Sequence, residues 1–87
     1  MKKGQTMDRK EVEEACATVL TPLVFQTLRG ARISLPSIIK TAALHCFTYP
    51  DGDPKGTRTV GETMKYIDAC KFLRTVMICI DEGGHIE

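Results

Sequence analysis

The sequence predicts a mostly α-helical, small single domain of three to four helices, with a Pro/Gly-rich loop or short β-hairpin near residues 48–59. A chain of 87 residues is long enough for one domain only. Apolar residues make up 43% of it and recur at helical spacing in several stretches. A dense group of turn formers, from Tyr49 to Gly56, separates the last stretch from the others. We expect residues 1–6 to form a flexible N-terminal tail, residues 7–82 the helical domain and residues 83–87 a frayed C-terminus.

The first two helices are short, and each has its own start signal. Asp8 is followed three residues later by Glu11, as in a capping box, in which the side chains satisfy the first backbone N–H groups. The apolar face behind this cap consists of Val12, Ala15, Cys16, Val19 and Leu20. Thr21 and Pro22 predict the start of a second helix, because proline suits the first position after an N-cap. Gly30 is expected to end that helix.

Ser34 is the expected N-cap of a third helix. The apolar residues after it follow the spacing of one helix face: Leu35, Ile38, Ile39, Ala42, Ala43 and Cys46. Ser37, Lys40 and Thr41 lie off this face.

The last helix is expected from about Val60 to Asp81, and it is apolar on two sides. Its main stripe has near-heptad spacing and consists of Tyr66, Ala69, Cys70, Leu73, Val76, Met77 and Ile80. A second set, Ile67, Phe72 and Ile78, points away from this stripe. Such a helix either crosses the middle of the fold or contacts another chain, and the sequence leaves both open. The segment 75–80 is also β-branched enough to form a strand.

Composition and cysteine spacing indicate an ordinary cytoplasmic protein. The net charge of +1 gives no strong electrostatic pointer to nucleic acid. No stretch approaches the roughly 20 apolar residues that span a bilayer, and the first residues lack the apolar region of a signal peptide. We therefore expect no membrane association. The four cysteines, Cys16, Cys46, Cys70 and Cys79, stand singly, and we expect each to be a small buried hydrophobic residue outside any disulfide.

The loop contains the best match to a metal-binding motif. Over the twelve residues from Asp51 to Glu62, acidic side chains stand at the first and third positions, glycine at the sixth and glutamate at the twelfth. This pattern resembles the calcium-binding loop of the EF-hand family, and the resemblance implies Asp51, Asp53 and Glu62 as ligands. Lys55 stands where the family places a ligand oxygen, and Arg58 where it has an apolar residue. Calcium binding is therefore a minor alternative to a plain turn without metal or cofactor.

Residues 27–40 resemble the helix-turn-helix of DNA-binding regulators, with a short helix, a tight turn and a second helix. On this hypothesis the hairpin forms a wing. The residues placed on DNA are Ser37, Lys40, Thr41, Lys55 and Arg58. Thr41, however, falls where the motif usually has an apolar core residue. Proteins that hold several phosphates also normally carry more positive charge than this chain. DNA binding is therefore the alternative hypothesis.

Catalysis is not expected. His45 and His85 belong to no recognisable Ser/His/Asp or Cys/His arrangement, and the chain has no P-loop or dinucleotide motif. We predict a small non-catalytic regulatory or inhibitory protein that acts by binding a protein partner, as a homodimer through the last helix. The predicted contact residues are Ile67, Phe72 and Ile78.

Overall fold

The computed structural model of the chain describes residues 6–50, 52 and 59–86. It consists of four helices: α1 (Arg9–Leu20), α2 (Pro22–Gly30), α3 (Leu35–Thr48) and α4 (Val60–Asp81). Two strands of two residues each, β1 (Thr6–Met7) and β2 (His85–Ile86), lie at the ends of the described chain. The predicted mostly helical single domain is confirmed.

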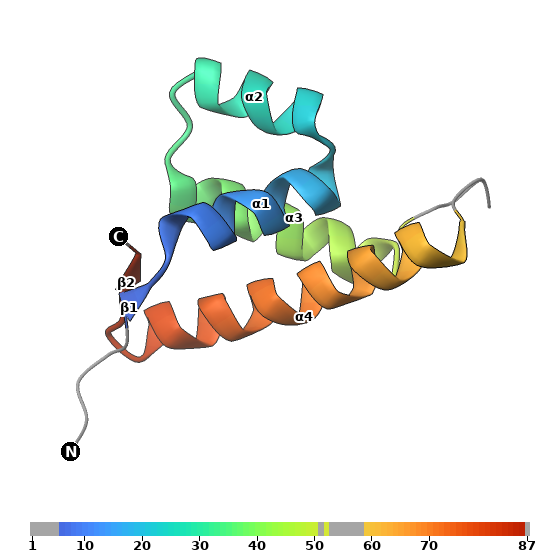
Figure 1. The fold of residues 1–87 in the computed structure, drawn as a ribbon. Coiled ribbons are helices and arrows are strands. Elements are labelled where there is room, and N and C mark those ends of the chain that lie inside the picture. Colours follow the sequence, from blue (N-terminus) through green and yellow to red (C-terminus); the bar gives the residue numbers. More distant parts are fainter. Residues whose placement is uncertain (1–5, 51, 53–58, 87) are drawn as a thin grey trace.

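The helices α1, α3 and α4 pack together, and α2 lies on top of α1 and α3 (Figure 1). The longest helix, α4, runs antiparallel to both α1 and α3 and contacts both of them (Figure 1). Because α4 packs against two helices at once, its apolar face has to be wide.

The core is formed by one face of each of the three packed helices. Its fully buried side chains are Val12, Cys16, Val19, Ile38, Ile39, Ala42, Tyr66, Leu73 and Val76. Among the described residues of α2, none is buried; Phe25 and Leu28 are half-buried and pack against the core. The helix α2 is therefore attached by one side only.

The predicted N-cap residues are confirmed, whereas the full capping box expected at Asp8 and Glu11 is found instead at Thr59 and Glu62. Asp8 caps α1 by accepting a hydrogen bond from the backbone N–H of Lys10 at 3.0 Å. Ser34 caps α3 in the same way, and Thr59 caps α4. Because these caps satisfy N–H groups that have no partner inside the helix, they fix where each helix begins.

Thr21 joins α1 directly to α2. It is both the C-cap of α1 and the N-cap of α2, and Pro22 occupies the first position of α2 as predicted. Its φ of 77° and ψ of 150° are unusual for a β-branched residue, which pays a steric cost at positive φ. The sharp change of direction between the two helices is therefore made at a strained residue.

The structure rules out a strand at residues 75–80 and places the arms of the predicted hairpin wing in helices. The segment 75–80, considered as a strand, is continuous helix within α4. The hairpin near residues 48–59 would need Phe47, Thr48 and Val60 in its arms, but the first two end α3 and the third begins α4. Tyr49 caps the end of α3 and Thr59 the start of α4, and residues 51 and 53–58 of the predicted span lie outside the described residues.

A short sheet forms where the sequence predicts loose ends. Thr6 and Met7 pair in parallel with His85 and Ile86. Met7 and Ile86 are half-buried against the core, which gives the pairing an apolar side. This contact brings the two ends of the described chain together (Figure 1).

The expectation of four separate cysteines is wrong for two of them. Cys46 of α3 and Cys70 of α4 form a disulfide, with their Cα atoms 5.9 Å apart. Cys16 and Cys79 are buried thiols, as predicted. The bond is possible because Cys46 and Cys70 each lie on the apolar face of their helix, and the antiparallel packing of α3 and α4 places the two residues opposite each other. The sequence alone does not reveal which residues of two helices will be opposite.

Candidate partner-binding surface

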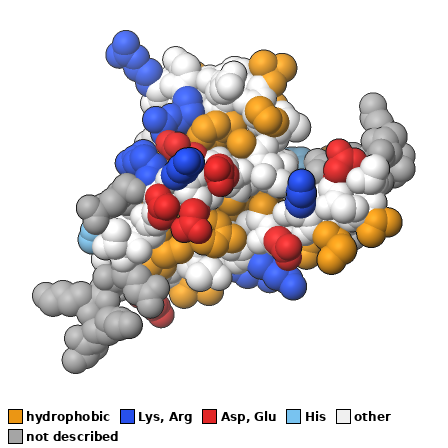
Figure 2. All heavy atoms as spheres, viewed as in Figure 1, with side chains coloured by type: hydrophobic (Ala, Val, Ile, Leu, Met, Phe, Trp, Pro, Cys, Tyr) orange, Lys and Arg blue, Asp and Glu red, His pale blue; other side chains and the backbone are white. Residues whose placement is uncertain are grey.

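One side of α4 carries large apolar side chains that face the solvent. Val60, Met64 and Ile78 are 78%, 61% and 54% exposed. They belong to a row with alternating spacing of four and three residues, which we call the outer row: Val60, Met64, Ile67, Lys71, Arg74 and Ile78. Along α4, Figure 2 shows apolar side chains over its first turns, basic ones near the middle and apolar ones again toward its end. The row therefore has two apolar ends and a cationic centre.

The three predicted contact residues lie in different surroundings. Ile78 is on the surface, whereas Ile67 and Phe72 are half-buried and pack against the core. Val60 and Met64 were not among the predicted contact residues, although their spacing from Ile67 places them on the same helix face. The first two turns of α4 were left out because the main stripe begins only at Tyr66.

The disulfide lies at the corner where the end of α3 meets the first half of α4. Phe47 follows Cys46 in α3 and is 82% exposed, and Leu44, two residues before Cys46, is 64% exposed. On α4, Ile67 of the outer row lies within one helical turn of Cys70. The corner therefore carries two exposed apolar side chains from α3 and a half-buried one from α4 beside the bond.

A buried tyrosine holds the same corner by hydrogen bonds. The ring of Tyr66 is fully buried, and its hydroxyl donates to the backbone carbonyl of Tyr49 at 2.9 Å. The Nδ1 atom of His45 lies 3.0 Å from that hydroxyl. Gly52 lies against the ring, since a Cβ atom added to it would be 2.5 Å from the Cγ of Tyr66. We call Tyr66, His45, Tyr49 and Gly52 the tyrosine cluster.

The residues predicted to contact DNA are only partly described. Ser37, Lys40 and Thr41 are exposed on the outward side of α3, while Lys55 and Arg58 lie outside the described residues. The hydroxyl of Thr41 donates to the carbonyl of Ser37 at 3.0 Å, so it is occupied within the helix. Lys40 is therefore the only cation among the described members of this set.

The residues of the calcium motif do not form a described site. Asp51 and Asp53 lie outside the described residues. Glu62 accepts a hydrogen bond from the backbone N–H of Thr59 at 2.9 Å, and the Thr59 hydroxyl accepts one from the N–H of Glu62 at 3.1 Å. Glu62 thus completes the capping box of α4. Over the described ranges, no group of three His, Cys, Asp or Glu residues stands close enough to hold a metal ion.

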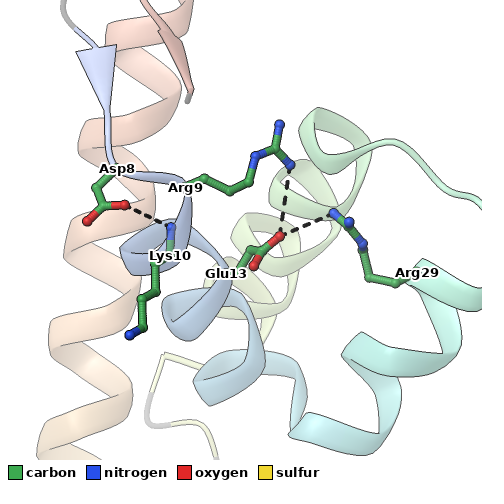
Figure 3. Close-up of polar contacts among 5 residues, drawn as sticks. All are labelled: Asp8, Arg9, Lys10, Glu13 and Arg29. Atoms are coloured by element: carbon green, nitrogen blue, oxygen red, sulfur yellow. Dashed lines mark hydrogen bonds and ion pairs between the residues drawn. The ribbon is translucent and has the colours of Figure 1, made fainter.

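An ion-pair group links α1 to α2 at the surface. The carboxylate of Glu13 lies 3.4 Å from the guanidinium of Arg29 and 3.9 Å from that of Arg9 (Figure 3). Both guanidinium groups are exposed to solvent and Glu13 is partly so, and such surface pairs contribute little to stability. Burial, together with the charge of Glu13, raises the pKa of Cys16 from 9.0 to about 11, which keeps that thiol protonated.

A pocket of about 220 Å³ lies between the start of α3 and the end of α4, and Arg9 and His85 are among the residues that line it. His85 is within hydrogen-bond distance of the Thr6 hydroxyl, at 3.2 Å.

In the described part of the chain, none of the helices is both long and apolar enough to cross a bilayer. Comparison with protein-family models, curated proteins and solved structures finds no match to this chain.

Proposed function

We propose that the protein is a small non-catalytic regulator that binds a protein partner, and that the first such partner is a second copy of itself. The observation that supports this proposal is the outer row of α4, where Val60, Met64 and Ile78 are each more than half exposed on a helix whose other side is core. Water disfavours apolar surface by roughly 25 cal/mol per Å², so covering these side chains would favour association.

The outer row suits antiparallel pairing with itself. Its positions 60 and 78, 64 and 74, and 67 and 71 are symmetric about residue 69. A two-fold axis at that point places Val60 against Ile78 of the second copy, apolar end to apolar end. The aliphatic stem of Lys71 then covers Ile67 of the second copy. Asp68 is exposed next to Ile67, so the same register brings each Lys71 beside an Asp68 of opposite charge.

A charge exchange tests this register. We expect Asp68→Lys and Lys71→Asp each to weaken a wild-type dimer about ten-fold, because two ion pairs become two repulsions. The double variant should restore the dimer, since it only reverses each pair. Lys65→Glu is the matched control, because Lys65 is exposed on α4 but lies off the outer row. Light scattering after size-exclusion chromatography measures the association, and a wild type that stays monomeric at every concentration would contradict the homodimer.

A second pair of variants separates surface from core. Ile78→Lys should leave the melting temperature nearly unchanged and reduce association, because Ile78 is exposed. Phe72→Lys should instead destabilise the fold, because Phe72 packs against the core. If Ile78→Lys unfolds the protein and Phe72→Lys does not, the assignment of the outer row is wrong.

DNA binding is the weaker proposal. The side of α3 that carries Lys40 and Thr41 also carries Leu44 and Phe47, which are 64% and 82% exposed. Large apolar side chains suit a protein surface better than a phosphate backbone. The same chromatography with mixed duplex DNA at low and moderate salt provides the check. A shift onto DNA that salt reverses would move DNA binding to first place.

We propose a cytoplasmic location, as expected from the sequence. Disulfides in the reducing cytoplasm are usually transient, catalytic or redox-sensing, so the Cys46–Cys70 bond would open and close there. Rapid alkylation of thiols in growing cells, followed by mass spectrometry, measures the oxidised fraction of this pair. A pair that is oxidised in every molecule would indicate an oxidising compartment instead.

A further inference from the structure

The disulfide is placed where it controls the corner between α3 and α4. Cys46 lies in the last turn of α3, and Cys70 lies in the middle of α4, 24 residues further along the chain. The bond therefore closes the loop between the two helices into a ring. Apolar side chains stand within one turn of the bond on both helices: Leu44 and Phe47 on α3 are exposed, and Ile67 on α4 is half-buried.

A second set of contacts, independent of the disulfide, also holds α3 against α4 at this corner. The hydroxyl of Tyr66 donates to the carbonyl of Tyr49, and its ring is buried in the core. These contacts remain when the disulfide opens. Reduction is therefore expected to change how tightly the end of α3 is held against α4, while the helices themselves persist.

The chemistry of opening is confined to one pair of sulfur atoms. Cys46 is 8% exposed and Cys70 is half-buried, so the sulfur of Cys70 is the more accessible to an incoming thiolate. The other two cysteines, Cys16 and Cys79, are buried. The pKa of Cys16 is raised by burial, which keeps it a thiol and a poor nucleophile. The reduced chain therefore has one accessible way to re-form a disulfide.

We propose that the Cys46–Cys70 bond is a redox switch, opened by a dithiol reductant, that sets the rigidity of the α3–α4 corner. Where the outer row binds a second copy, as proposed above, opening the bond weakens that binding. A thiolate of the reductant attacks the sulfur of Cys70, the S–S bond breaks, and the sulfur of Cys46 leaves and takes up a proton. The second thiol of the reductant loses its proton and displaces the sulfur of Cys70, which leaves as a thiolate and takes up a proton, and the reductant's own disulfide forms. Two electrons pass from the dithiol to the protein.

Hydrogen exchange followed by mass spectrometry tests the switch on the intact chain. The oxidised protein is compared with protein reduced by dithiothreitol and with the double variant Cys46→Ser/Cys70→Ser. Amides at the end of α3 and in the first half of α4 should exchange about ten- to a hundred-fold faster in both, because the ring no longer restricts the local open state. Amides of α1 should change little. The control is Cys16→Ala, which leaves the bond intact and should respond to reductant like the wild type.

The outcomes separate this inference from the proposed function. Unchanged exchange at the corner after complete reduction would overturn the switch, and so would exchange that rises equally throughout the chain, because the fold would then depend on the bond. Chromatography of the same samples follows association, and we expect the reduced dimer to dissociate about ten-fold more readily. A protein that is monomeric in both states contradicts the homodimer alone, since the exchange data still decide the switch. A dimer of equal strength in both states would contradict the coupling of the switch to the outer row.

Discussion

Replacing Gly52 with alanine should destabilise the fold by about 3 kcal/mol, because two costs add at this position. The φ of Gly52 is +73°, where a residue with a Cβ atom loses roughly 1 kcal/mol. The added Cβ would also lie 2.5–2.7 Å from three atoms of the Tyr66 ring. That ring is fully buried and has no room to retreat, and overpacking of this kind costs about 1–3 kcal/mol.

Urea unfolding followed by circular dichroism measures the loss. For a domain of this size, about 3 kcal/mol lowers the melting temperature by roughly 12–24 °C. Gly61→Ala is the matched control, because Gly61 lies in the first turn of α4 with nothing within 4 Å of an added Cβ. Alanine is the better helix former, so the control should be about 0.5 kcal/mol more stable than the wild type. The same substitution is thus expected to have opposite signs at the two positions.

Asparagine at position 52 separates the two costs. Asparagine tolerates positive φ better than alanine but carries the same Cβ atom. If contact with the Tyr66 ring dominates, Gly52→Asn should be at least as harmful as Gly52→Ala. An asparagine variant that is clearly more stable than the alanine variant would show that only the backbone conformation matters. A Gly52→Ala variant that loses less than about 1 kcal/mol would refute the contact itself.

Three further predictions concern single side chains. Tyr66→Phe should lower the free energy of unfolding by about 1–2 kcal/mol in urea, because the hydroxyl no longer donates to the Tyr49 carbonyl; no change would contradict that bond. Thr21→Gly should raise the free energy of unfolding by about 1 kcal/mol, because glycine adopts the positive φ without a steric cost. This gain is larger than the loss of the capping hydrogen bond from the N–H of Val24, which is long at 3.4 Å. Stability should fall as the pH rises from 9 to about 11, because the folded chain keeps the Cys16 proton that the unfolded chain releases. The Cys16 contribution is at most about 2 kcal/mol, and Cys16→Ala should show a correspondingly smaller fall between pH 8 and pH 10.5.

Local signals in the sequence were sufficient to predict the helices. The range Val60–Asp81 was predicted and is observed, and the helix starts at Asp8, Thr21 and Ser34 coincide with the caps in the structure. A cap and the helix that it begins are neighbours in sequence, so their interaction does not depend on the rest of the fold. Gly30, the predicted end of α2, is its last residue, although the positive φ that follows the helix is adopted by Arg32 and not by the glycine.

Contacts between distant residues were not predictable in the same way. The disulfide needs Cys46 and Cys70 to face each other across two antiparallel helices, which periodicity within each helix does not specify. The pairing of Thr6 with His85 joins residues 79 positions apart and involves strands too short to show any alternation. The tyrosine cluster was missed because its key acceptor is a backbone carbonyl, that of Tyr49, which carries no signal in the sequence.

The two-sided apolarity of α4 has two separate causes, and the sequence did not distinguish them. A helix that packs against α1 and α3 at once needs an apolar face wider than the stripe of a helix with one neighbour. Phe72 and Ile67 widen that face, because both are half-buried against the core. Val60, Met64 and Ile78 cannot be explained in this way, since more than half of each side chain faces the solvent. Packing inside the domain therefore accounts for part of the second side, and the part that it leaves unexplained is the outer row on which a protein partner is proposed to bind.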